Sequence, residues 1–527
     1  MADAPPPAST MPQDATSSET TQAQSKKLIN LLRGWPSPAL LPKAHLLDAS
    51  HRVLSTASIS TPALQYAPDP GYQPLIDSLA QWLSASYPSF SPSSSSSSAA
   101  AVAGIRPDEI AITGGASQSL ACILQSYTDP GYTRAVWAVA PCYFLGCPIF
   151  EDAGFSGRVR AVREDEAGLD LEALEEGFRR LEEQWQGQRQ GEEGRGEIGK
   201  GVYKDVGPHR KLYRHVVYLV ATCANPSGKT MGVERRLRLV QLARKYDALV
   251  VSDDVYDFLQ WPVSPIEPAA ASTLPRHSPL PPLLPLLSQI DAALGPSQHN
   301  PPGKNFGHAV SNASFSKLVG PGMRTGWIHA TADFAFGFSQ TGTNRSGGAA
   351  SQFAAAVVHQ VMAAGALEKW LAEVVRPGLR RRHGLMLEAV RKELGPLGVS
   401  VWGGNGLQGV REGGGKGDRD GDGKGGVFGG YFVWLTLPLG LDANVVAERA
   451  KEGENLIIAP GRLFEVRGDE EAARFPGNVR LCFSWEDEED VVEGVRRLGS
   501  VLRRMLDRTD SKTERREGGG TRAEGFK

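Results

Sequence analysis

Two short apolar runs separated by an amphipathic segment stand out in the middle of the chain. Residues 215–222 (HVVYLVAT) and the first part of 248–256 (ALVVSDDVY) are almost continuously hydrophobic, which is typical of strands buried on both faces of a parallel sheet. Residues 235–247 (RRLRLVQLARKYD) join them, with apolar side chains at helical spacing. This pattern predicts a βαβ unit and therefore an α/β fold, whose ligands collect at the carboxyl ends of the strands.

A second pattern follows near the end of the chain. Residues 429–438, 455–466 and 478–485 are predicted strands, and residues 487–506 form an amphipathic helical pattern. They predict a smaller α+β domain, shared with the residues before about 60. The predicted division is a small domain from 27–62 and 361–507, and a large domain at 63–360 with a mainly parallel sheet covered by helices on both faces.

Low-complexity stretches interrupt these patterns. Such compositions bury too little apolar surface to offset the entropy of ordering, so we expect mobile segments there. Residues 261–306 are Pro-rich, but their LLPLLSQIDAAL stretch predicts a short packed helix. The predicted leader, inserts and tail are 1–26, 88–104, 184–209, 261–306, 411–427 and 508–527.

The composition excludes several classes of protein. A formal net charge of −2 over 527 residues gives no field that favours nucleic acid or an anionic membrane. No apolar run approaches the roughly 20 residues that span a bilayer. The first arginine is Arg33, so the N-terminal segment resembles neither a presequence nor a signal peptide, and we expect a cytoplasmic protein. The five cysteines contain no C-x-x-C pair, which argues against a zinc site or disulfide framework; they are residues 122, 142, 147, 223 and 482.

The stretch CANPSGKT, residues 223–230, is one glycine short of a phosphate-binding P-loop. Cys223 occupies the position of the first glycine, and Pro226 removes an N–H donor that the loop needs. We therefore disfavour a nucleotide-binding loop and interpret NPSG as a side-chain amide presented at a strand end. The DRDGDG stretch at 418–423 begins like a calcium loop but has Gly429 where glutamate is required, so no metal site is expected.

The stretch SNASFSKLVGPGMRTGWIHA, residues 311–330, offers a more specific chemistry. Lys317 stands among small hydroxyl residues, and Arg324 follows seven positions later in a Gly-rich turn. This arrangement suits an aldehyde cofactor that bears a phosphate, because an amine forms a Schiff base while an arginine and hydroxyl groups hold the phosphate. Ser314 and Ser316 are the candidate hydroxyls.

This stretch resembles the class I/II aminotransferases, and other stretches of the chain carry the same resemblance. They are INLLRGWPSPALLP (29–42), LQYAPDPGYQPLIDSLAQWL (64–83), ITGGASQSL (112–120), APCYF (140–144), NPSG, SDDVY and NVRLCFS. The class I/II aminotransferases are fold-type-I enzymes that use pyridoxal 5′-phosphate (PLP). The resemblance runs from about Ile29 to Leu506 and is greatest to 2-aminoadipate and kynurenine aminotransferases and their fungal relatives. It implies homodimers with shared active sites.

The resemblance implies how PLP would be held. Tyr143 would stack on the pyridine ring, and Asn225 and Tyr256 would bond the ring oxygen. Asp253 would keep the ring nitrogen protonated, so that the ring accepts electrons. The neighbouring Asp254 is a rival, but the family spacing of three to Tyr256 selects Asp253. The phosphate would be bound by three parts of the protein. They are a helix N-terminus with Ala116 and Ser117, the Lys317 loop with Ser314, Ser316 and Arg324, and a tyrosine of the neighbouring subunit that corresponds to Tyr66.

The resemblance also implies a reaction. Arg480 would hold the substrate α-carboxylate with a bidentate fork beside Gly34 and Asn225. Lys317 would carry PLP as an aldimine and, once displaced, move the proton between the substrate Cα and the cofactor. The expected activity is ping-pong transfer of an amino group from an L-amino acid (2-aminoadipate, aromatic or kynurenine-like) to a 2-oxo acid such as 2-oxoglutarate. Arg33 and Trp35 flank Gly34 and are candidate contacts for a substrate side chain, or rim residues.

One other function stays open at this point, and two further functions are disfavoured. Another fold-type-I PLP enzyme, such as a C–S lyase, synthase or decarboxylase, would use the same cofactor residues, because the cofactor performs the chemistry. A PLP-sensing transcription regulator would need a DNA-binding domain ahead of residue 29. A nucleotide-hydrolysing enzyme would need the disfavoured P-loop.

Overall fold

The computed structural model of the chain describes residues 26–91, 104–192, 203–263, 280–348, 350–401 and 426–517. Most of the predicted leader, much of the predicted inserts and the last ten residues lie outside the described residues, and so does the DRDGDG stretch. Over the described ranges, no helix combines the length and apolar character that a membrane span requires.

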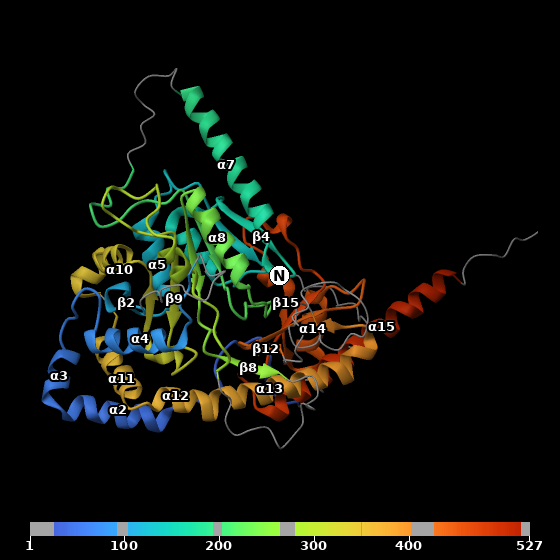
Figure 1. Ribbon diagram of the computed structural model, residues 1–527. Coiled ribbons are helices and arrows are strands. Elements are labelled where there is room, and N and C mark those ends of the chain that lie inside the picture. Colours follow the sequence, from blue (N-terminus) through green and yellow to red (C-terminus); the bar gives the residue numbers. More distant parts are fainter. Residues whose placement is uncertain are drawn as a thin grey trace, which may run out of the picture.

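An eight-stranded sheet forms the centre of the large domain (Figure 1). The inner strands β3, β4, β6, β7 and β9 pair in parallel, whereas β10 runs antiparallel to both of its neighbours and β5 antiparallel to β4. The predicted βαβ unit is confirmed as the adjacent strands β6 and β7. In sheet order the strands are β2 (Ile110–Thr113), β10 (Gly326–His329), β9 (Ala309–Ser314), β7 (Ala248–Asp253), β6 (His215–Leu219), β3 (Ala135–Ala140), β4 (Val159–Asp165) and β5 (Gly168–Leu169).

Helices cover both faces of this sheet because its buried strands send alternate side chains to opposite sides. Val216 and Tyr218 pack under α5 (Ala116–Tyr127) and α10 (Ala332–Ser339). Val217 and Leu219 pack under α7 (Leu171–Glu192), α8 (Val233–Lys245) and α9 (Leu287–Ala293). The α9 segment is the short packed helix predicted within 261–306.

Four further helices pack together along the lower edge of the large domain as drawn in Figure 1. They contact one another through α11, which touches the other three. They are α2 (Lys43–Ser55), α3 (Ala57–Ala63), α4 (Gln73–Ser86) and α11 (Gln352–Ala363).

The small domain is built from both ends of the chain, as predicted. Its antiparallel sheet has the order β11-β13-β16-β15, and the parallel pair of β1 and β14 adds the N-terminal segment. Its strands are β1 (Ile29–Asn30), β11 (Ser400–Val401), β13 (Phe432–Thr436), β14 (Leu456–Ile457), β15 (Ala459–Pro460) and β16 (Asn478–Cys482). Its helices are α12 (Ala366–Trp370), α13 (Arg376–Ala389), α14 (Ala443–Glu454) and α15 (Glu488–Glu517).

The structure differs from the predicted inserts and tail at three places. Helix α7 continues to Glu192, inside the predicted 184–209 insert, and α15 continues to Glu517, inside the predicted tail. Charged residues and glutamine are good helix formers, and a helix that has begun adds residues at little cost, so a polar composition does not end it. The third difference is an antiparallel pair between β8 (Gln260–Val263) and β12 (Gly426–Gly429), which places the boundaries of two predicted inserts side by side.

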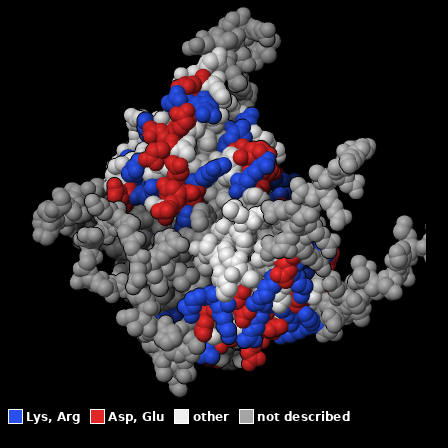
Figure 2. All heavy atoms as spheres, turned by 90° about the vertical axis from the view of Figure 1, so that its right-hand side faces the viewer, with Lys and Arg blue, Asp and Glu red and all other residues white. Residues whose placement is uncertain are grey.

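Charged side chains gather in two areas of the face shown in Figure 2, with a belt of uncharged residues between them. Acidic and basic groups alternate within each area. Two ion pairs between α7 and α8 are examples of such neighbouring opposite charges: Arg238 with Glu172, and Lys245 with Glu175. Opposite charges therefore balance locally over the described surface of these two helices.

Candidate active site

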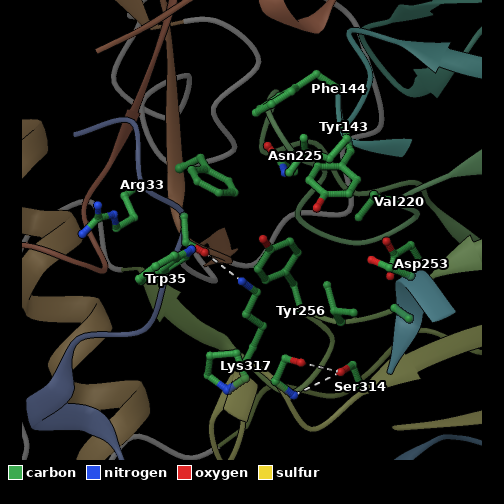
Figure 3. Close-up of a pocket in the computed structure, with 18 of the residues that line it drawn as sticks. Arg33, Trp35, Tyr143, Phe144, Val220, Asn225, Asp253, Tyr256, Ser314 and Lys317 are labelled. Carbon is green, nitrogen blue, oxygen red and sulfur yellow. Dashed lines mark hydrogen bonds between the residues drawn. The ribbon is translucent and has the colours of Figure 1, made fainter. Parts of the chain in front are cut away.

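A cavity of about 470 Å³ opens where the carboxyl ends of the sheet strands meet the small domain. Residues far apart in the chain share its wall, and Figure 3 shows several of them projecting into it. Twelve predicted site residues line the cavity: Gly34, Ala116, Ser117, Tyr143, Asn225, Asp253, Tyr256, Ser314, Ser316, Lys317, Arg324 and Arg480. The structure therefore brings together every predicted site residue except Tyr66.

Lys317 lies directly beyond the end of β9. Its Nζ donates a hydrogen bond to the backbone carbonyl of Gly34 over 2.7 Å and lies 5.2 Å from the ring centre of Tyr431. Burial lowers the pKa of the Lys317 ammonium group to about 8, because the charged form loses its hydration. A lysine with this pKa supplies a neutral, nucleophilic amine near physiological pH.

Asp253 ends strand β7 on the cavity side. Burial raises the pKa of its carboxyl to about 6, although Tyr218 donates a hydrogen bond to Oδ2 over 2.8 Å and the Lys317 charge attracts the carboxylate. The other oxygen, Oδ1, is buried and has no hydrogen-bond partner among the described residues. Asp254 is not in the cavity wall, and its Oδ1 accepts a hydrogen bond from Ser252. Asp253 is therefore the carboxylate presented to a cationic group of a ligand.

The opposite end of the cavity suits an oxyanion. Helix α5 begins there after Gly115, whose φ of +103° favours glycine, and its first two residues, Ala116 and Ser117, line the cavity. The first backbone N–H groups of a helix have no acceptor within the helix and favour an anion. The Arg324 Nη2 donates to the carbonyl of Gly114 over 2.8 Å. A Cβ atom on Gly115 would lie only 2.8 Å from that nitrogen, so a larger residue would crowd the anion site.

Two serine hydroxyls complete this end. The Ser314 Oγ donates to the Ser316 Oγ over 2.8 Å, and Arg324 Nη1 lies 3.4 Å from the Ser316 Oγ. A cation, hydroxyl groups and a helix N-terminus converge here, which is the set of donors that a phosphate requires.

The Arg480 guanidinium lies on the small-domain side of the cavity, stacked against Phe432 at 4.0 Å and Phe464 at 4.8 Å. Its Nη1 donates to Asn225 Oδ1 over 2.8 Å and its Nη2 donates to the carbonyl of Leu32. Its Nε has no hydrogen-bond partner among the described residues, and burial lowers its pKa to about 10. A buried arginine with an unused donor is a receptor for a carboxylate.

Aromatic side chains form the remaining wall. Figure 3 shows Tyr143 and Tyr256 on the cavity side, with Tyr143 close to Asn225. Burial is the main reason that the pKa of Tyr143 is raised, to about 12, and the pKa of Tyr256 lies well above its usual value. Both phenols are therefore hydrogen-bond donors at neutral pH.

Sequence reasoning missed three residues around this cavity. Tyr218 bonds Asp253, Tyr431 lies under the Lys317 amine, and Phe432 stacks on Arg480. All three lie in or beside predicted strands, where aromatic residues are ordinary core residues, so no local signal distinguishes them. Arg33 lies in the wall, as does Trp35, and its guanidinium lies 4.5 Å from the ring centre of Trp35 and 5.0 Å from that of Trp485.

Tyr66 is the exception. Its side chain is 83% exposed, lies against Gly347 and does not line the cavity of its own chain.

A metal site would need a cluster of ligand side chains. In the part of the chain that the structure describes, no three His, Cys, Asp or Glu side chains cluster in a way that suits a metal ion.

The residues present fit PLP on structural grounds. The amine of Lys317, the oxyanion site at Gly115 and the partnerless Oδ1 of Asp253 match an aldehyde, a phosphate and a protonated ring nitrogen. The loop at Cys223–Thr230 is closed on itself by backbone bonds, since the Ala224 N–H donates to Lys229 over 2.9 Å and the Gly228 N–H donates to Ala224 over 2.7 Å. The N–H groups of Ala224 and Gly228 are therefore used within the loop and are not available to a phosphate, as the N–H groups of a P-loop are.

Comparisons with known proteins agree with this geometry. The model of the family "Aminotransferase class I and II" matches residues 40–498. An uncharacterized protein of Saccharomyces cerevisiae is 30% identical, over 90% of this chain and 97% of its own length. The 2-aminoadipate transaminase of Thermus thermophilus is 27% identical over 92% of each chain. The crystal structure of Pyrococcus horikoshii kynurenine aminotransferase superposes with a TM-score of 0.64 at 24% identity, covering 94% of this chain and 96% of the other. The chain belongs to the class I and II aminotransferase family and is a PLP-dependent transaminase.

Proposed function

We propose that the described cavity is the active site of this transaminase, with PLP bound between Lys317, Asp253 and the oxyanion site at the start of α5. The observation that carries the proposal is that Lys317, Asp253 and Arg480, each from a different part of the chain, line one cavity. Tyr143 would stack on the ring, and Asn225 and Tyr256 would bond its ring oxygen. The phosphate would be held by Ala116, Ser117, Ser314, Ser316 and Arg324.

The protein side chains would divide the work of amino transfer. Bound PLP supplies an electron sink that stabilises negative charge at the substrate Cα. Arg480 binds the α-carboxylate beside Gly34 and Asn225, and so fixes the Cα–H bond near the Lys317 Nζ. That amine removes the proton at Cα and returns it on the cofactor side, which its pKa near 8 allows. Asp253 keeps a positive charge on the ring nitrogen.

The proposed amino donor is an L-amino acid of the 2-aminoadipate, aromatic or kynurenine type, and the proposed acceptor is a 2-oxo acid such as 2-oxoglutarate. The names of similar proteins support this range. They do not favour the alternative of a lyase, synthase or decarboxylase on the same scaffold. The match to a yeast protein supports a place in a fungal-type subgroup.

We also propose a homodimer in the cytoplasm. Tyr66 supports the dimer, because it is exposed and outside its own cavity, as expected of a tyrosine that reaches the phosphate site of a second copy. The five cysteines are all unpaired and buried, which supports a reducing compartment. The proposed domain division, 27–62 with 361–507 against 63–360, is supported by the eight-stranded sheet, which lies within 63–360, and by the four-stranded sheet, which lies within 361–507.

A donor screen tests the proposed function. Purified protein is incubated with 2-oxoglutarate and each of 2-aminoadipate, kynurenine, phenylalanine, tyrosine, leucine and alanine, and glutamate formation is measured. We expect glutamate in a 1:1 ratio to the new 2-oxo acid, and loss of that activity in Lys317→Ala. Borohydride reduction followed by peptide mapping should label Lys317. Product formation without an acceptor, or labelling of a different lysine, would contradict the proposal.

A further inference from the structure

A buried ion pair lies behind the NPSG loop, outside the wall of the cavity. The side chains of Lys229 and Glu164 are only 6% and 4% exposed, and Lys229 Nζ lies 3.8 Å from Glu164 Oε2. Lys229 Nζ also donates to the carbonyl of Asp165 at the end of β4. Burying two opposite charges costs several kcal/mol of hydration for each ion, so such a pair needs a compensating role in stability or in placement.

The pair touches the loop at two points. Lys229 is itself a loop residue, and its carbonyl accepts the backbone N–H of Ala224, directly before Asn225. The hydroxyl of Ser227, two residues after Asn225, lies beside the Glu164 carboxylate and helps to lower its pKa against the effect of burial. Both attachments flank Asn225, so the position of its side chain depends on where β4 holds this pair.

The loop in turn positions the cavity side chains. The Asn225 Oδ1 accepts a hydrogen bond from Arg480 over 2.8 Å, and Arg480 comes from the small domain. Val220 borders both the cavity and a small void whose wall includes Glu164 and Lys229, so the walls of the two spaces share this residue. The Glu164 side chain is only 4% exposed, and this burial raises its pKa to about 7 against the attraction of Lys229.

We propose that the Lys229–Glu164 pair positions the NPSG loop, and through it the Asn225 amide and the Arg480 guanidinium, for binding of cofactor and substrate carboxylate. Lys229 and Glu164 are positioning residues, since neither lines the cavity. This inference rests on the proposed function of the cavity. The competing interpretation is an ion pair that contributes to stability alone.

Three variants separate these interpretations. Lys229→Met removes the cation and leaves a buried carboxylate alone, which destabilises the fold as well. The double variant Glu164→Gln/Lys229→Met removes that unpaired charge, so it keeps the test valid if the single variant folds poorly. The control is Lys211→Met, which breaks a matched buried pair: Lys211 Nζ lies 2.6 Å from Asp247, both side chains are 7% exposed, and neither lines the cavity.

The first measurement is amide hydrogen exchange at residues 223–230 in the cofactor-free protein. We expect exchange to become about tenfold faster in both Lys229 variants and to stay unchanged in the control, because about one hydrogen bond's worth of stabilisation is lost. The second measurement is steady-state kinetics of the PLP-loaded enzyme. The KM for the amino donor should rise about tenfold while kcat changes less, as expected for weaker carboxylate binding.

Two results would overturn the inference. One is that the double variant has the same amide exchange rates at residues 223–230 and the same KM as the wild type. The other is a loss of melting temperature equal to that of the control with no local change at 223–230. A wild-type protein without transaminase activity would instead reject the proposed function, and the exchange measurement would still decide whether the pair orders the loop.

Discussion

The amine of Lys317 and the backbone carbonyl of Gly34 form a 2.7 Å hydrogen bond across the cavity, and 283 residues separate them in the chain. Gly34 lies on the N-terminal segment, which pairs with the small domain through β1, whereas Lys317 extends from the central sheet. The bond therefore joins the two domains at the reactive amine. It also partly offsets the hydration that the Lys317 ammonium group loses on burial.

Burial of Lys317 makes the stability of the cofactor-free protein depend on pH. Its folded-state pKa of about 8 lies below the usual 10.5, so between these values the unfolded chain binds more protons and the free energy of unfolding rises with pH. Lys317→Met removes the free-energy cost of burying the ammonium group. We expect it to stabilise the cofactor-free protein at pH 7 by up to about 3 kcal/mol, a gain that shrinks as the pH approaches 10. Melting temperatures at pH 7 and 10 measure it; a lower melting temperature of the variant at pH 7 would contradict the expectation.

The Tyr218 hydroxyl is expected to control the pH dependence of cofactor binding. Asp253 must be ionised to pair with a protonated ring nitrogen, and its pKa of about 6 implies weaker PLP binding below pH 6. Tyr218→Phe removes a hydrogen bond to the carboxylate, which raises the pKa of Asp253. The acidic limb of a plot of PLP dissociation constant against pH should therefore move about one unit higher.

Tyr213→Phe is the matched control for this measurement. Tyr213 is also a buried tyrosine, but its hydroxyl donates to the carbonyl of Gly307 and it does not line the cavity. Its pH profile should coincide with that of the wild type. Coinciding profiles for wild type and Tyr218→Phe would show that the hydroxyl does not stabilise the Asp253 charge.

Gly115→Ala should weaken PLP binding by about tenfold, since backbone strain costs about 1–3 kcal/mol and the added methyl group meets Arg324. Isothermal titration of the cofactor-free protein with PLP measures the change. Gly207→Ala is the control, because Gly207 also has a positive φ, of +63°, but an added Cβ there meets no atom within 4 Å. Equal losses of PLP affinity in both variants would indicate general strain and not a phosphate contact.

Arg480→Lys should lower kcat/KM for the amino donor by about a hundredfold, because an ammonium group cannot form the bidentate fork with a carboxylate. It should change the PLP dissociation constant by less than about threefold, since the contacts of Arg480 are with Asn225, Leu32, Phe432 and Phe464 and not with the phosphate residues. Initial rates over a range of donor concentrations, with PLP titration in parallel, check both. A large loss of PLP affinity with normal kcat/KM in saturating PLP would assign Arg480 to the cofactor.

The sequence by itself predicted the parts of this protein whose physical cause is local. The continuous apolar run at 215–222 predicts a strand covered on both faces, because only a strand without a solvent face lacks polar alternation. Motifs such as NPSG and SDDVY predict which side chains follow the strands. The predicted starts of the insert at 184 and of the tail at 508 differ from the structure, where helices continue to Glu192 and Glu517, because composition does not show where a helix that has begun will end.

Tertiary structure alone decided which distant residues meet. The bond from Arg480 to Asn225 spans 255 positions, that from Tyr218 to Asp253 joins neighbouring strands, and Lys229 reaches Glu164 behind the loop. The family resemblance implied that Arg480 and Asn225 lie near each other, but no pattern along the chain indicated the other two pairs. A charged or hydrogen-bonding side chain in a strand gives the same sequence signal whether its partner is water or a buried side chain. Burial also sets the pKa values of Lys317 and Asp253, since the loss of hydration depends on what the fold packs around each charge.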